Sequence, residues 1–265
     1  QTEHLPSIEQ IIRASLDARD CSDASIRLLQ RWLSKLLAVH PQASIGLIGQ
    51  ISRERGRIFV QSYGRELNAS EAQALCAVLL PIMQPWERRQ QIEDILSIVN
   101  FIGKAIKAVP ELLRMLEQIA DEQLDWAASR ALYALHRYAR KTFNQIVPRL
   151  LANDPSWITQ PLVHNFVHSK RQDLLTPFLP VQRYKGKFST GKSAYLLPIQ
   201  RGFERWTTKQ QQIYAQALIK QTEQTDHQHP HLVEYAQRLA YLSEVAPTRL
   251  IELAQLDAPI VVLRD

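Results

Sequence analysis

The sequence predicts an all-α fold, and three observations lead to this class. Apolar residues recur with the helical period almost everywhere, and no segment has the pattern of a convincing strand. Only eight of the 265 residues are glycine, which argues against a turn-rich β architecture. Leu, Ala, Gln, Arg and Glu are plentiful, and these residues favour helices.

The N-terminal part of the chain carries two clear helix starts. Ser7 with Gln10, and Ser70 with Gln73, have the spacing of capping boxes, in which two side chains satisfy amides at a helix N-terminus. Residues 53–68 hold two glycines and are expected to form a loop. The helices expected in this part are 7–16, 23–39, 44–52, 70–80 and 86–102.

Prolines open several helices in the rest of the chain. Pro110, Pro155 and Pro247 each stand where the first turn of a helix is expected, and a first-turn proline loses no helical hydrogen bond. Residues 180–200 are expected to be irregular, because prolines and glycines interrupt every periodic pattern there. The helices expected in this part are 111–120, 124–140, 142–152, 156–168, 171–179, 208–224, 231–245 and 248–256.

The order of the helices resembles the HEAT-like family of α-solenoids. Residues 124–132 (LDWAASRAL) and 257–265 (DAPIVVLRD) resemble the Asp…Val/Ala…Arg opening of an inner helix in that family. The resemblance implies a single domain over residues 1–265, an irregular α-α superhelix of stacked antiparallel helical hairpins. Because the chain begins with Gln1 and its last nine residues would open a helix without a partner, we expect a fragment of a longer protein.

The amino-acid composition limits the partners and the compartment that we expect for this chain. The net charge of +6 favours anionic partners such as nucleic acid or a membrane surface. The longest apolar stretch, 74–83, is interrupted by Pro81 and is too short to span a bilayer, and no signal peptide is visible. Cys21 and Cys76 are isolated in helical patterns and are expected to be small core residues, as in a reducing compartment. We therefore expect a cytoplasmic protein without a membrane partner.

Residues Gly186–Ser193 (GKFSTGKS) match the phosphate-loop pattern GxxxxGK[ST]. A phosphate loop lies between a buried strand and a long helix, whose N-terminus helps to bind the phosphates. Pro177 and Pro180 interrupt any strand before the motif, and Pro198 interrupts the helix after it. We therefore predict that the match is coincidental, that no β-strand precedes Gly186, and that the chain binds no cofactor.

The segment 174–203 contains no acidic residue and alternates cations with the rings of Tyr184, Phe188, Tyr195 and Phe203. Cations neutralise phosphates and rings stack on bases, so this composition suits single-stranded nucleic acid. The alternative is a solvated loop whose rings fix it to the helices. The candidate nucleic-acid or anion contacts in and just beyond this segment are Arg183, Lys185, Lys187, Lys192, Arg201, Arg205 and Lys209.

Histidines form two groups with the spacing of metal ligands. His164 and His168 lie four positions apart on an expected helix, but the sequence offers no third ligand and no glutamate between them. The segment Asp226–His231 alternates histidines and is expected to be a polar connector between helices. We expect no metal ion at either place.

Asp125, Trp126 and Arg130 are the residue types that HEAT-like DNA glycosylases use in a concave cleft, which gives an enzymatic alternative by resemblance. Core packing of Trp126 is the simpler interpretation. The function that the sequence favours is a non-enzymatic interaction scaffold for a protein partner. The alternatives are a nucleic-acid-binding module that uses the basic segment and, third, a glycosylase; the sequence leaves the oligomeric state open.

Overall fold

The computed structural model describes residues 10, 14, 23–55, 67–83, 89–122, 125–199, 202–224 and 231–246. Of these, 82% are helical and 3% lie in strands, which confirms the all-α class. Contacts divide the chain into two compact units, Gln1–Ile146 and Val147–Asp265, and each is described by itself below. Within the described residues, no helix is both long enough and apolar enough to cross a membrane. The solenoid stacking and the single domain stay predictions.

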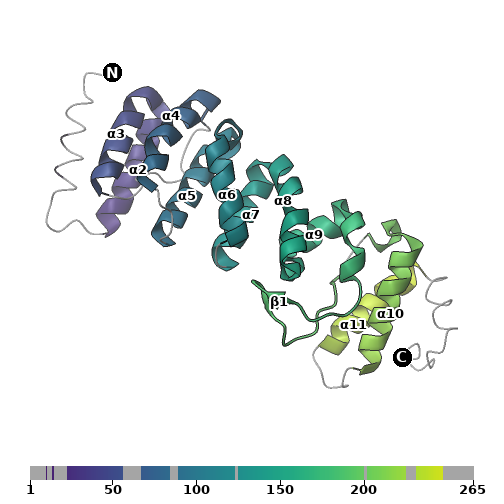
Figure 1. Cartoon of the computed structure of the whole chain (residues 1–265). Coiled ribbons are helices and arrows are strands. Elements are labelled where there is room, and N and C mark those ends of the chain that lie inside the picture. Colours follow the sequence, from purple (N-terminus) through teal and green to yellow (C-terminus); the bar gives the residue numbers. More distant parts are fainter. Residues whose placement is uncertain are drawn as a thin grey trace. The chain divides into compact units, whose positions relative to one another are not determined.

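The first unit is a succession of helices (Figure 1). Helix α2 packs on α3, α3 on α4, and α6 on α7. In chain order the elements are α2 (Asp23–Val39), α3 (Pro41–Arg55), α4 (Ala69–Leu79), the 3₁₀ helix η1 (Leu80–Met83), α5 (Arg89–Ile102), the 3₁₀ helix η2 (Gly103–Ala108), α6 (Pro110–Glu122), α7 (Asp125–Tyr138) and the first part of α8 (Arg140–Asn153).

The pair of α6 and α7 shows why these segments form helices. The buried residues of α6 recur at intervals of three and four, which places them on one face. Helix α7 turns a face of fully buried alanines to the core, and small side chains allow neighbouring helices to approach closely. The buried residues of these faces include Leu112, Met115, Leu116 and Ile119 in α6 and Ala127, Ala128 and Ala131 in α7.

The capping box expected at Ser70 and Gln73 is wrong, because the helix begins two residues earlier. Asn68 is the N-cap of α4, and its Oδ1 accepts the amide of Glu71 at 3.0 Å. Glu71 Oε2 in turn accepts the amide of Asn68 at 2.9 Å. Asparagine is as good a cap as serine, so the pattern in the sequence did not decide between the two registers.

The second unit combines α-helices with several short 3₁₀ helices and a small hairpin (Figure 1). Helix α10 packs on α11, and β1 packs on η3. After the rest of α8, the elements are η3 (Pro155–Thr159), α9 (Pro161–Lys170), η4 (Gln172–Leu174), η5 (Thr176–Phe178), β1 (Lys185–Gly186), β2 (Ser189–Thr190), η6 (Phe203–Arg205), α10 (Thr208–Gln224) and α11 (His231–Val245), where η denotes a 3₁₀ helix.

Two expected helices in this unit agree with the structure, and two do not. The helix expected at 171–179 is wrong, because this stretch forms the two short 3₁₀ helices η4 and η5. The single helix expected at 156–168 is wrong: η3 ends before Gln160, and Pro161 begins α9 with a first-turn proline. The helices expected at 208–224 and 231–245 are confirmed. The expected helices 7–16 and 248–256 and the motif 257–265 lie outside the described residues, apart from Gln10 and Ala14.

The expectation that no strand precedes Gly186 is wrong, and residues 180–200 are not wholly irregular. Strand β1 pairs antiparallel with β2, in the register Lys185↔Thr190 and Gly186↔Ser189, and Gln182 bridges to Tyr195 behind them. The hairpin forms because η3 and its N-cap bind the turn. Asp154 Oδ2 accepts the amide of Lys187 at 2.9 Å, and Ser156 Oγ accepts the amide of Phe188 at 3.1 Å.

Helices α10 and α11 hold the extended chain that follows the hairpin. Tyr214 donates its hydroxyl to the Leu197 carbonyl at 2.7 Å. The guanidinium of Arg238, which is 8% exposed, donates to the carbonyls of Leu196 at 3.3 Å and Leu197 at 3.4 Å and pairs with Glu234. These bonds satisfy backbone groups that have no helical or sheet partner.

We predict that Gly186→Ala destabilises the second unit by about 1–3 kcal/mol, because overpacking forces neighbours apart. A Cβ at position 186 would lie 2.0 Å from Asp154 Oδ1 and 2.6 Å from Ser156 Oγ, the groups that hold the turn. Urea unfolding followed by circular dichroism measures the change. The control is Gly46→Ala in α3, where a Cβ meets nothing within 4 Å and helix propensity gives a gain of about 0.5–1 kcal/mol. Equal stability of Gly186→Ala and wild type would refute the proposed role of the turn contacts.

Candidate functional site

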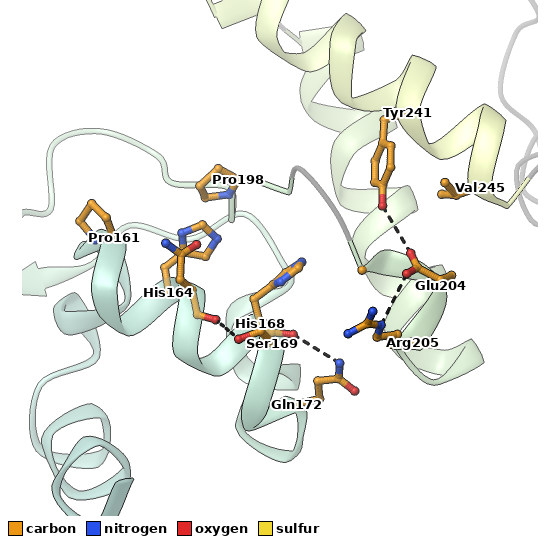
Figure 2. Close-up of a pocket in the computed structure, with 12 residues that line it drawn as sticks. Pro161, His164, His168, Ser169, Gln172, Pro198, Glu204, Arg205, Tyr241 and Val245 are labelled. Atoms are coloured by element: carbon orange, nitrogen blue, oxygen red, sulfur yellow. Dashed lines mark hydrogen bonds and ion pairs between the residues drawn. The ribbon is translucent and has the colours of Figure 1, made fainter. Parts of the chain in front are cut away.

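A groove of about 760 Å³ lies in the second unit, between α9, Pro198 with residues 202–205, and α11 (Figure 2). Its volume is within the roughly 300–1,000 Å³ that ligand sites occupy. Its wall contains two prolines and a valine together with side chains that can form hydrogen bonds. We call it the α9–α11 groove, and its lining residues are Pro161, His164, Asn165, His168, Ser169, Gln172, Pro198, Gly202, Glu204, Arg205, Tyr241 and Val245.

Two histidines of α9 form one side of the groove. They lie one helical turn apart, with ring centroids separated by 6.1 Å, and Figure 2 shows His164 beneath Pro198. The backbone of Pro198 lies near the imidazole of His164 and favours its protonated form. Because proline has no amide hydrogen, the group that acts on the imidazole is the carbonyl oxygen. This approach places Pro198 beside α9.

A glycine at position 202 allows the chain to pass close to the second histidine. Gly202 has φ +88°, and a Cβ there would lie 3.3 Å from Cε1 of His168. The ring of His168 packs edge-on against Trp206, with ring centroids 5.4 Å apart, and Trp206 packs against Tyr214, with ring centroids 5.6 Å apart. The groove therefore rests on a buried aromatic cluster.

Paired charges form the opposite wall. Glu204 lies 3.6 Å from the guanidinium of Arg205 and accepts the Tyr241 hydroxyl at 3.4 Å (Figure 2). On α9, Ser169 donates its hydroxyl to the Asn165 carbonyl at 2.6 Å. The charges of this wall are compensated locally, so the groove has no strong net charge of its own.

Burial keeps both histidines uncharged near neutral pH. It lowers the pKa of His164 from 6.5 to about 4, the backbone of Pro198 acts against this, and the positive charges of His168 and Arg238 add to it. Burial also lowers the pKa of His168, with Glu204 acting against it and Arg205 adding to it. The Nε2 atom of His168 is buried and has no hydrogen-bond partner among the described residues. This nitrogen is therefore enclosed by the protein behind the groove surface.

The seven candidate cations occupy several places. Three of them are exposed on or beside the hairpin. Lys187 is half-buried in the hairpin turn, and its Nζ lies 5.7 Å from the centroid of the Trp157 ring. Arg205 belongs to the groove wall, Lys209 is exposed in the first turn of α10, and Arg201 lies outside the described residues. The three exposed hairpin cations are Arg183, Lys185 and Lys192.

The rings between these cations do not face solvent as base stacking requires. Tyr184 is 5% exposed and Phe203 1%. The ring centroids of Phe188 and Trp157 lie 4.4 Å apart, and half-buried Tyr195 donates its hydroxyl to the Ile158 carbonyl at 3.3 Å. The alternative considered for this loop, in which its rings fix it to the helices, describes the structure.

Residues Gly186–Ser193 do not have the geometry of a phosphate loop. They form the hairpin, and the chain after it stays non-helical up to Ile199. The turn amides of Lys187 and Phe188, the kind of group that would bind phosphate, already donate to Asp154 and Ser156. A carboxylate at this position also repels phosphate.

The remaining candidates have structural contacts. The Asp125 carboxylate accepts the amide of Trp126 at 2.7 Å, and the guanidinium of Arg89 lies 4.9 Å from the Trp126 ring. Burial raises the pKa of the Cys76 thiol to about 12, which makes it a poor nucleophile. No group of three or more metal-ligating side chains occurs in the described part of the chain. Residues 225–230 and Cys21 lie outside it.

Sequence reasoning missed the groove as a site. It identified His164 and His168 as a helical pair and Arg205 as a cation, but not Glu204 or Tyr241. The lining comes from three segments between Pro161 and Val245, and no local pattern joins them. The one local signal was Gly202, a glycine that the positive φ requires.

Comparisons with known proteins add no assignment: no family model, no curated protein and no solved structure matches this chain.

We predict that stability falls on acidification because of His164. Its folded pKa of about 4 lies below the ordinary 6.5, so between these values the unfolded state binds a proton that the folded state excludes. The contribution is complete above pH 6.5 and is lost as the pH falls towards 4, by about 3 kcal/mol in total.

The test is urea unfolding of wild type and His164→Gln at several pH values across this window. Glutamine retains a donor for the Pro198 carbonyl but does not titrate, so we expect its stability to fall less steeply with pH than that of wild type. The two proteins should have parallel profiles above pH 6.5. Parallel profiles down to pH 4 would show that His164 does not carry the effect.

Proposed function

We propose that this chain is a non-enzymatic interaction module, and that its second unit docks an extended segment of a protein partner in the α9–α11 groove. The observation that carries the proposal is the composition of the groove wall, which combines apolar side chains with uncharged hydrogen-bonding side chains and one pair of opposite charges. An extended peptide needs the same combination, because its backbone needs donors and acceptors while its side chains need apolar contacts.

Side-chain amides support peptide recognition. The carboxamides of Asn165 and Gln172 both line the groove, and a carboxamide offers a donor and an acceptor to a peptide backbone. Pro161, Pro198 and Val245 supply the apolar contacts.

The state of the polar groups supports binding rather than catalysis. The Ser169 hydroxyl donates to a backbone carbonyl within its own helix, and the Glu204 carboxylate is engaged by Arg205 and Tyr241. A nucleophile or general base needs a neighbour that activates it, as in paired nucleophile and base arrangements. The HEAT-like assignment, the protein partner and the cytoplasmic location rest on the sequence and stay predictions.

We predict that Ser169→Trp blocks the groove. Ser169 is exposed on α9 and lines the groove, so an indole there fills the space for a ligand without disturbing the core. A displayed library of random peptides, sorted for binding to the wild-type chain, should yield peptides whose affinity for Ser169→Trp is lower by about tenfold or more. Titration calorimetry of synthetic copies gives the affinities.

The matched control is Gln145→Trp, which places the same indole on an exposed position of α8 in the first unit. Selected peptides should bind it as they bind wild type. Failure to select any peptide, or peptides that bind all three proteins equally, would refute docking in this groove.

A further inference from the structure

The hairpin of the second unit carries cations without anions of its own. We call residues 182–195 the basic hairpin; the surrounding segment 181–199 contains no Asp or Glu. Arg183, Lys185 and Lys192 are exposed, and none of the three pairs with a carboxylate among the residues that the structure describes. The carboxylate of Asp154 contacts the hairpin, and it accepts the amides of Lys187 and Ser156.

The hairpin is fixed, so its cations stand on a defined backbone. Gln182 and Tyr195 exchange backbone hydrogen bonds of 3.1 and 2.7 Å at its base. Its turn is bound by Asp154 and Ser156, and Phe188 packs on Trp157. Residues that are already ordered lose less conformational entropy when they bind a partner.

The surface around these cations is polar. Rings of this segment are turned to the core, and none of the large exposed hydrophobic residues of the described chain lies within 181–199. A protein interface requires an apolar centre with aromatic anchors, which this surface does not offer. Contacts to a nucleic-acid backbone require only cations and polar groups that approach phosphates.

We propose that the basic hairpin binds the phosphate backbone of nucleic acid, without reading the bases. None of its three exposed cations lines the α9–α11 groove, so this function is independent of peptide docking. Without exposed rings the hairpin has no stacking surface for single strands, and the higher charge density of a duplex makes the duplex the tighter ligand. Binding is electrostatic and depends steeply on salt.

The test is fluorescence anisotropy of a labelled duplex and of one of its strands, titrated with the full chain between about 50 and 200 mM salt. Three phosphate contacts weaken duplex binding roughly 40-fold over this range. The hairpin variant is Arg183→Gln, Lys185→Gln and Lys192→Gln combined. Its plot of log affinity against log salt should be shallower than that of wild type by about 2.7, and its affinity at low salt should fall more than tenfold.

The control variant combines Lys104→Gln, Lys107→Gln and Lys141→Gln, which remove the same charge from exposed positions of the first unit. It should bind the duplex like wild type. A second variant keeps the charges: Arg183→Lys, Lys185→Arg and Lys192→Arg combined should retain binding, which separates loss of charge from loss of fold.

Several results would overturn the proposal. These are equal loss of binding in the hairpin and control variants, tighter binding of the single strand than of the duplex, affinity that depends on the base sequence, and no duplex binding at the lowest salt. Binding of polyglutamate in preference to the duplex would assign the hairpin to acidic proteins instead and would equally overturn it.

Discussion

Side chains that bond to backbone groups hold the non-helical segment 181–199, and the rest of the second unit depends on these bonds. A chain outside helices and sheets must find other partners for its buried amides and carbonyls. Asp154 and Ser156 bind the hairpin turn, and Arg238 and Tyr214 bind the carbonyls that follow. Removing such a partner leaves a buried polar group unsatisfied, which costs about 1–3 kcal/mol.

The same segment gives the second unit two surfaces of opposite character. Its first part forms the basic hairpin, where exposed cations have no carboxylate partners among the described residues. Near its end, Pro198 lines the α9–α11 groove, where burial keeps His164 and His168 neutral and Arg205 is paired with Glu204. The exposed positive charge of the hairpin favours nucleic acid as a ligand. The groove, whose charges are paired, favours a peptide.

Helices could be predicted from the sequence where periodicity and start signals agree, as at 208–224 and 231–245. Prediction was wrong where two local signals competed. Asn68 and Ser70 are both good N-caps, and the choice between them was made by the reciprocal bond with Glu71. Local sequence patterns could not predict the hairpin or the groove. The tertiary fold alone brings together Asp154 and Lys187 at the hairpin, and His164 and Pro198 at the groove.

The bonds that fix the segment 181–199 also set an order for folding during synthesis. Helix α6 ends at Glu122 and α7 begins at Asp125, so this pair can pack as soon as both have been made. The Asp154 carboxylate can bond to its partner amide only after 33 further residues have been synthesised. The Leu196 carbonyl can bond to its partner guanidinium only after 42 further residues have been synthesised. Contacts of such separation slow folding. In a ribosome-bound chain that stops before α11, the second unit would therefore lack the bonds that Arg238 makes to its backbone carbonyls. The first unit, whose helices pack largely on neighbours in the sequence, would already be able to fold.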